Sequence, residues 1–165
     1  DEKRGAQGIL TTSDVFRFIM NELPDLKTIL RVEDYMTSDL VVVDPDTSLL
    51  EAQRLMGIKR IRSLPVVEEG KLVGLVTRTD MVKVEPSRFA SPHNQEQSLA
   101  ILLQPIEKIM TRRLITTTPK ANLISAASSM LENKIHCLPV LDGEGQLSGI
   151  ITDSDLFRMV VKKFL

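Results

Sequence analysis

Residues 64–80 read LPVVEEGKLVGLVTRTD, and residues 138–155 read LPVLDGEGQLSGIITDSD. Both stretches contain Leu-Pro-Val, a turn with glycine, and the pattern Gly-h-h-Thr-x-x-Asp, in which h is an apolar residue. The second stretch has one additional residue in its turn, where a change of length costs least. The chain therefore contains a duplicated unit, and each candidate functional residue should occur twice.

The duplication continues upstream of both stretches at a constant shift of 74 residues. It pairs Met36-Thr37 with Met110-Thr111, and the strand and helix positions that follow also match. Residues 1–20 form a partial third copy, because they align with residues 142–161 at a shift of 141. From this copy we expect the chain to be a piece of a longer protein with a further repeat upstream.

The composition argues against several classes of function. The 165 residues carry a net charge of −1, which does not suit a nucleic-acid-binding surface. The sequence has no apolar run of membrane-spanning length, so we expect no membrane contact, and the single Cys137 fits a reducing, cytoplasmic compartment. No metal-ligand spacing and no nucleophile–base pair recurs in the repeats, so we expect neither a metal site nor an enzyme.

Each repeat predicts the order strand, helix, strand, strand, helix. In the first copy the predicted strands are 40–43, 64–67 and 72–76, and the second helix begins near Thr77. Ser48 and Glu51 have the spacing of a capping box, so they predict the start of the first helix, and Gly57 is expected to end it. In the second copy the predicted elements are strands 114–117, 138–141 and 147–151, a helix over 123–133 and a helix from Ser154 onward.

We therefore predict an α/β (α+β) fold of two pseudo-symmetric β-α-β-β-α domains packed through their sheets. About fifty residues per repeat are few for a separate core, so the two repeats should share one. The expected organisation is the end of an incomplete upstream repeat at 1–20, a linker at 21–31, a first domain at 32–85, a linker with a short helix at 86–105, and a second domain at 106–165.

The ordered motifs resemble the cystathionine-β-synthase (CBS) domain, which occurs as tandem pairs called Bateman modules. The resemblance covers residues 32–165, and residues 1–20 resemble the tail of a further CBS domain. It implies a regulatory module without catalysis that binds adenosyl ligands in clefts between the two domains. AMP, ADP, ATP or S-adenosylmethionine would suit such clefts, with Mg²⁺ as an optional companion, and the family commonly forms homodimers.

The candidate ligand-binding residues lie first in the strand-to-helix loops. A helix start offers unpaired N–H groups and a positive dipole to a phosphate, and threonine hydroxyls can add a hydrogen bond. Aspartate accepts hydrogen bonds, and in similar proteins it binds the ribose diol, whereas glycine allows close approach of the backbone. The residues concerned are Gly74, Thr77 and Asp80 in the first copy and Gly149, Thr152 and Asp155 in the second. The Thr-x-x-Asp spacing is equally that of a helix cap that needs no ligand, and both interpretations stay open.

A second group of candidates lies on or before strands. Arg62 and His136 precede the Leu-Pro-Val runs at a position that contacts phosphate in similar proteins, and arginine pairs well with phosphate. Arg60 and Lys134 stand two residues earlier and are equally consistent with solvated charges. The first strand of each repeat, at Val42 and Thr116, would flank the base.

The two sites should differ in their charge. Arg78 in the first copy corresponds to Asp153 in the second, so a phosphate would be attracted to one site and repelled by the other. We expect the first site to prefer phosphorylated ligands. The second should take a neutral or cationic adenosyl group, bind through a divalent cation, or stay empty. The alternative to ligand sensing is a ligand-free dimerisation or interaction module.

Overall fold

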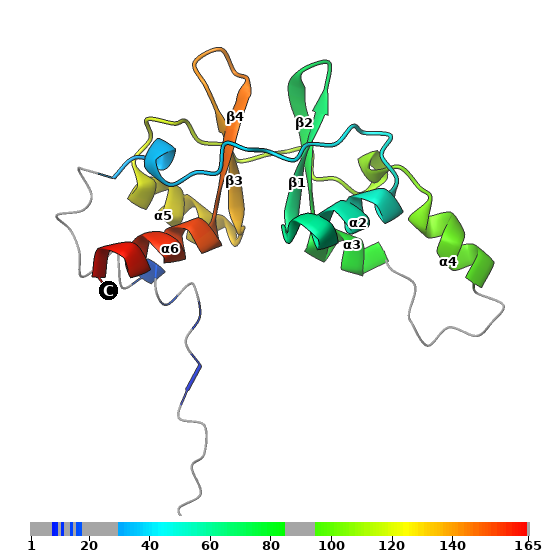
Figure 1. The fold of residues 1–165 in the computed structure, drawn as a ribbon, viewed down its shortest axis with the longest axis horizontal. Coiled ribbons are helices and arrows are strands. Elements are labelled where there is room, and N and C mark those ends of the chain that lie inside the picture. Colours follow the sequence, from blue (N-terminus) through cyan, green and yellow to red (C-terminus); the bar gives the residue numbers. More distant parts are fainter. Residues whose placement is uncertain are drawn as a thin grey trace, which may run out of the picture. The chain divides into compact units, whose positions relative to one another are not determined.

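The computed structural model describes residues 8–9, 11, 14, 16–17, 30–84 and 95–164, and the mixed helices and short sheets of the predicted fold class are present (Figure 1). The chain forms two compact units. Unit 1 comprises Asp1–Ser38, Thr116–Leu141 and Ser148–Leu165, and unit 2 comprises Asp39–Ile115 and Asp142–Leu147.

Unit 2 is organised around an antiparallel hairpin against which two helices pack (Figure 1). Its turn places Glu69 and Gly70 at positive φ, 50° and 79°, as a two-residue hairpin turn requires. The elements are α2 (Leu49–Lys59), β1 (Ser63–Glu68), β2 (Lys71–Thr77), α3 (Arg78–Val84), α4 (Gln95–Leu102) and the 3₁₀ helix η4 (Ile106–Lys108).

Helix α2 begins as predicted but ends later. Ser48 Oγ accepts a hydrogen bond from Glu51 N at 3.2 Å, which is one half of the expected capping box. The Glu51 carboxylate instead accepts two hydrogen bonds from Arg54, both at 2.8 Å, and these lower the pKa of Glu51. The helix passes through Gly57, so the expected ending there was wrong. It ends at Arg60, whose φ of 56° lies in the left-handed region.

Unit 1 repeats this arrangement with its own hairpin, β3 with β4. Helix α5 has the predicted bounds, and the Asn122 side chain caps it by accepting from Ile124 N at 2.9 Å and Ser125 N at 3.2 Å. Lys134 ends α5 at a φ of 54°, as Arg60 ends α2. The elements are the 3₁₀ helix η2 (Val32–Asp34), α5 (Leu123–Asn133), β3 (Cys137–Leu141), β4 (Leu147–Thr152) and α6 (Asp153–Phe164).

The first predicted strand of each repeat is not a regular strand. Residues 40–43 and 114–117 are extended, and each makes one parallel bridge, Val43 with Val66 and Thr117 with Val140. The expectation of regular strands over 40–43 and 114–117 was therefore wrong, and Val42 is 45% exposed. The proline two residues after each bridge has no N–H to donate, so a longer ladder cannot form there.

The core of each unit includes the first residues of the other repeat. Val32, from the first repeat, is fully buried in unit 1, and Val32 N donates to Ala121 O at 3.0 Å. Ile106, from the second repeat, is fully buried in unit 2, and Ile106 N donates to Thr47 O at 2.9 Å. We call residues 30–38 and 104–115 the exchanged segments. Each compact unit is thus assembled from parts of both repeats, so the boundaries of the units differ from those of the repeats in the sequence.

A methionine of each exchanged segment covers the glycine that opens Gly-h-h-Thr-x-x-Asp. A Cβ on Gly74 would clash with Met110 Sδ and lie 2.9 Å from Met110 Cγ. A Cβ on Gly149 would lie 2.6 Å from Met36 Sδ and 3.2 Å from the backbone oxygen of Thr37. These contacts leave no room for a side chain at either glycine.

We expect Gly149→Ala to lower the free energy of unfolding by about 1–3 kcal/mol, because its Cβ would press on a backbone oxygen as well as on Met36. Gly74→Ala should cost less, since the flexible Met110 side chain can move aside. Gly57→Ala is the control: it lies in open space within α2 and should raise stability by about 0.4–1 kcal/mol. Urea unfolding of the three variants measures the order, and equal effects at all three positions would contradict it.

Candidate functional site

The loop between β2 and α3 forms a closed set of hydrogen bonds around Asp80. Asp80 Oδ2 accepts from Thr77 N at 3.1 Å and from Thr77 Oγ1 at 2.6 Å. In return, Asp80 N donates to Thr77 Oγ1 at 3.3 Å. This is the reciprocal geometry of a capping box, so the helix-cap interpretation of the sequence is confirmed for this loop.

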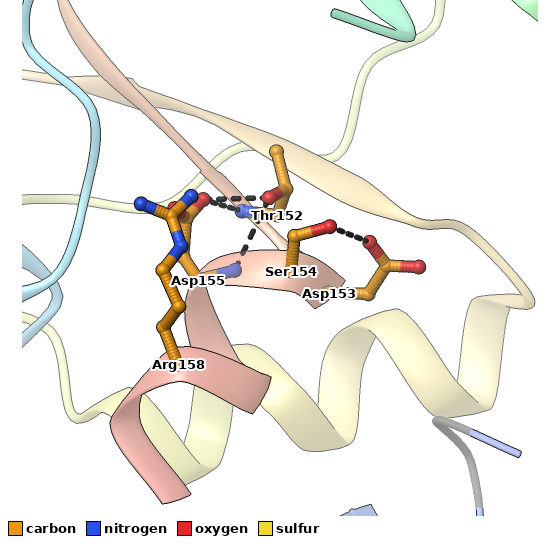
Figure 2. A network of polar contacts seen from close by, with 5 residues as sticks. All are labelled: Thr152, Asp153, Ser154, Asp155 and Arg158. Carbon is orange, nitrogen blue, oxygen red and sulfur yellow. Dashed lines mark hydrogen bonds and ion pairs between the residues drawn. The ribbon is translucent and has the colours of Figure 1, made fainter. Parts of the chain in front are cut away.

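The same box recurs at the start of α6, where Figure 2 shows it from close by. Asp155 Oδ2 accepts from Thr152 N at 2.9 Å and from Thr152 Oγ1 at 2.6 Å, and Asp155 N donates to Thr152 Oγ1 at 3.4 Å. In the partial third copy, Thr11 N and Thr11 Oγ1 donate to Asp14 Oδ2 at 2.9 and 2.5 Å. The Thr11 hydrogen bonds lower the pKa of the Asp14 carboxyl group.

A cation three residues after each aspartate holds the other carboxylate oxygen. Lys83 Nζ lies 3.3 Å from Asp80 Oδ1, and Arg158 Nη2 lies 2.8 Å from Asp155 Oδ1 (Figure 2). Arg17 Nη1 lies farther from Asp14 Oδ1, at 3.8 Å. These basic residues were not among the predicted site residues, although a basic residue recurs at the fourth position of each Asp-x-x-Lys/Arg run in the sequence.

The two aspartates differ in burial. The Asp155 side chain is 3% exposed, whereas the Asp80 side chain is 17% exposed. A buried carboxylate is tolerated only when hydrogen bonds and a counter-charge compensate the lost hydration. Asp155 has both, from Thr152 and Arg158. Each aspartate is therefore fixed in one orientation, with its two oxygens facing different donors.

The structure brings the candidate charges together in pairs. Arg78 N donates to Arg62 O at 2.9 Å, so the two arginines are backbone neighbours, and both side chains are exposed. At the equivalent place in unit 1, Asp153 N donates to His136 O at 3.0 Å. His136 Nδ1 lies 3.4 Å from Asp153 Oδ2, and Asp153 is 4% exposed. One unit therefore presents two cations where the other presents a buried carboxylate beside an imidazole.

The remaining candidates lie in different surroundings. Arg60 and Lys134 are the exposed left-handed residues that end α2 and α5, so their conformation has a structural explanation that needs no ligand. Val42 and Thr116 are exposed on the extended segments.

The reason given for the two glycines needs correction. Met110 and Met36 fill the space that Gly74 and Gly149 leave open, so close approach there is by a side chain of the protein itself. As ligand contacts, the two glycines remain predictions.

Two features are absent from the residues that the structure describes. In that part of the chain, no helix combines the length and the apolar character needed to cross a membrane. Among the same residues, no three His, Cys, Asp or Glu side chains gather as they would around a metal ion.

Comparison with known proteins identifies the family. The CBS domain model matches residues 32–87 and 106–162, which are the two repeats. This chain belongs to the CBS domain family. The resemblance inferred from the sequence is thereby confirmed, together with the tandem arrangement of two CBS domains. At the sequence level the chain is 34% identical to protein MJ1225 of Methanocaldococcus jannaschii over 151 residues, covering 91% of this chain and 53% of that protein. It thus spans about half the length of that CBS relative.

Solved structures of CBS proteins extend the comparison. The crystal structure of MJ1225 superimposes with a TM-score of 0.78. The CBS domain pair of protein MJ0100, solved with 5′-methylthioadenosine and S-adenosyl-L-methionine, is 30% identical, with a TM-score of 0.68 over 82% of this chain and 98% of that one. CBSX2, from Arabidopsis thaliana, was solved with AMP and is 31% identical, with a TM-score of 0.67 over 81% of this chain and 97% of that one.

We expect Thr77→Ala and Thr152→Ala each to lower the free energy of unfolding by about 1 kcal/mol in the absence of ligand, because each removes a side-chain cap from a helix. The serine variants should retain most of that stability, since serine keeps the hydroxyl. Thr79→Ala, at an exposed position of α3, is the matched control and should change stability by less than about 0.5 kcal/mol. Thermal unfolding measures all five variants, and alanine variants as stable as the parent would show that the caps contribute nothing.

Proposed function

We propose that this CBS pair is a regulatory module that senses an adenine nucleotide or adenosyl compound and transmits binding as a conformational change. The observation that carries the proposal is the doubled Thr-x-x-Asp box, with a charged pair beside each copy. Support comes from CBS relatives of about 30% identity that hold AMP, 5′-methylthioadenosine or S-adenosyl-L-methionine in their solved structures.

The box offers the chemistry that a ribose needs. A ribose diol donates two hydrogen bonds, and a carboxylate fixed by neighbouring donors accepts them without reorganising. In unit 2 the diol would take Asp80 Oδ1 from Lys83, whose exposed ammonium returns to solvent at little cost. In unit 1 the corresponding exchange releases Arg158 from Asp155. Val42 and Thr116, both exposed, would lie along the base.

The charges beside the boxes would separate two classes of ligand. Arg62 and Arg78 suit the phosphate of AMP, ADP or ATP, because both guanidinium groups can donate forked hydrogen bonds. Next to His136, the buried Asp153 carboxylate repels a phosphate and suits a neutral or cationic group, such as the sulfonium of S-adenosylmethionine. A phosphorylated ligand would need Mg²⁺ at this second place.

A ligand-free interaction module is the second candidate, and one observation favours it. The threonine hydroxyl and both carboxylate oxygens of each box have partners without a ligand, so these side chains need none for stability. In either case we propose a cytoplasmic homodimer that acts without catalysis, and a chain with the single cysteine Cys137 is in keeping with a reducing compartment.

The proposal is tested by isothermal titration with AMP and with 5′-methylthioadenosine, each with and without Mg²⁺. We expect AMP to bind with one strong site per chain. Arg62→Ala and Arg78→Ala should each weaken that binding about tenfold, equal to about 1.4 kcal/mol. Arg54→Ala, which removes an exposed arginine from α2, is the control and should bind as the parent does.

A second arm of the same titration addresses unit 1. Asp153→Asn removes the repelling charge and should strengthen AMP binding at the second site, while leaving the first unchanged. Two identical phosphate-dependent sites in the parent protein would contradict the charge assignment. Absence of binding by either ligand, with no nucleotide retained from purification, would favour the interaction module.

A further inference from the structure

Each box is attached to a methionine-threonine pair that belongs, by sequence, to the other repeat. In unit 2 the pair is Met110-Thr111, and in unit 1 it is Met36-Thr37. These are the two dipeptides that the duplication aligns with each other. Both copies therefore make corresponding contacts, as they do in the boxes, although these contacts join residues far apart in the chain.

Two kinds of contact fasten the pair to the strand that ends in the box. Leu75 and Thr111 exchange backbone hydrogen bonds of 3.0 and 2.9 Å, and Ile150 and Thr37 exchange bonds of 3.0 and 2.9 Å. Beside each of these bridges the methionine packs on the glycine, with Met110 7% exposed. The strand is thus held by its hairpin partner on one edge and by the methionine-threonine pair on the other.

The attachment lies close to the ligand-binding atoms proposed above. Leu75 is two residues before Thr77, and Ile150 is two residues before Thr152. A strand rises about 3.3 Å per residue, so a shift of the bridged residue is carried to the threonine within about 7 Å. A close-packed interior has little free volume, so a shift at one residue of the strand moves its neighbours as well.

We propose that Met110 and Met36 are positioning residues for ligand binding, each setting the box carried by the other repeat. The inference rests on the proposed function and adds to it the groups that control affinity without touching the ligand. By linkage, a ligand that tightens the unit 2 box would stabilise the Leu75–Thr111 bridge, and the bridge would stabilise ligand binding to the same degree.

The first test is methyl NMR of protein labelled at the methionine methyl groups, titrated with AMP and with 5′-methylthioadenosine. The chain has seven methionines, so each signal is assigned by one Met→Leu variant. Binding should shift the signals of Met110, Met36 or both, while Met56 and Met130, buried in the helix-packed cores, stay in place. Binding that leaves the Met110 and Met36 signals unmoved would overturn the proposal.

The second test measures affinity by titration of variants. Met110→Ala should weaken AMP binding about tenfold, and Met110→Leu, which keeps the volume, should restore it to within about threefold. Met56→Ala removes a methionine that is buried still more deeply in the core of the same unit, and it should lose stability without losing affinity. If Met110→Ala fails to fold, Gly74→Ala displaces the Met110 side chain from the opposite side and should weaken binding in its place.

The outcomes separate this inference from the function on which it rests. A parent protein that binds neither AMP nor 5′-methylthioadenosine overturns the proposed function and, with it, the positioning role. A parent that binds, with Met110→Ala or Gly74→Ala binding equally well, overturns the positioning role alone. Loss of affinity in Met56→Ala equal to that in Met110→Ala would show a general effect of destabilisation and would also overturn it.

Discussion

The rest of the structure depends on one packing constraint. The first residues of each repeat are buried in the unit that contains most of the other repeat. Val32 and Ile106 are fully buried, and burial of such side chains contributes about 1.5–3 kcal/mol each. The hydrogen bonds Val32 N to Ala121 O and Ile106 N to Thr47 O tie the same residues to the loops that precede α5 and α2. Without these segments, each unit would lack part of its core, and one edge of its hairpin would lose its hydrogen-bonding partner.

The hydrogen bonds within each box allow a short loop to be both a helix cap and a candidate ligand site. The Thr-x-x-Asp boxes form their hydrogen bonds within the protein, so the helix caps need no ligand. What a ligand would change is the partner of one carboxylate oxygen, which Lys83 and Arg158 hold in its absence. Such an exchange leaves the cap in place and costs little in unit 2, where both Lys83 and Asp80 reach solvent. In unit 1 the ligand would have to replace the hydrogen bond that Arg158 donates to the buried Asp155.

Local features of the fold could be predicted from the sequence. The bounds of α5, the Ser48 cap, the two hairpins and the start of α3 follow from patterns within a few residues of each element. The continuation of α2 past Gly57 was missed because glycine is tolerated inside a helix and Arg60 adopts the left-handed conformation instead. The exposure of Val42 was missed because a β-branched run predicts a strand whether or not it finds a second partner.

The segment exchange could not be predicted from the sequence, because the two repeats are duplicates of each other. Val32 and Ile106 occupy the same position of their repeats, so either could complete either core with the same pattern of apolar residues. The Thr-x-x-Asp boxes and the charged residues beside them were predicted as candidates from the sequence. The ion pairs of Lys83 and Arg158 span three residues of one helix and could have been predicted. The contacts of Met110 and Met36 join residues far apart in the chain, so they appear only once it is folded.

Native-state amide hydrogen exchange of the exchanged segments tests the account most directly. The amides of Val32, Thr37, Ile106 and Thr111 should be protected to the same degree as the interior of α5. They should exchange only when the protein unfolds globally, since their hydrogen bonds belong to the cores. Exchange at rates close to those of an unstructured peptide, with α5 still protected, would show that each repeat is complete without the other's first residues and would contradict it.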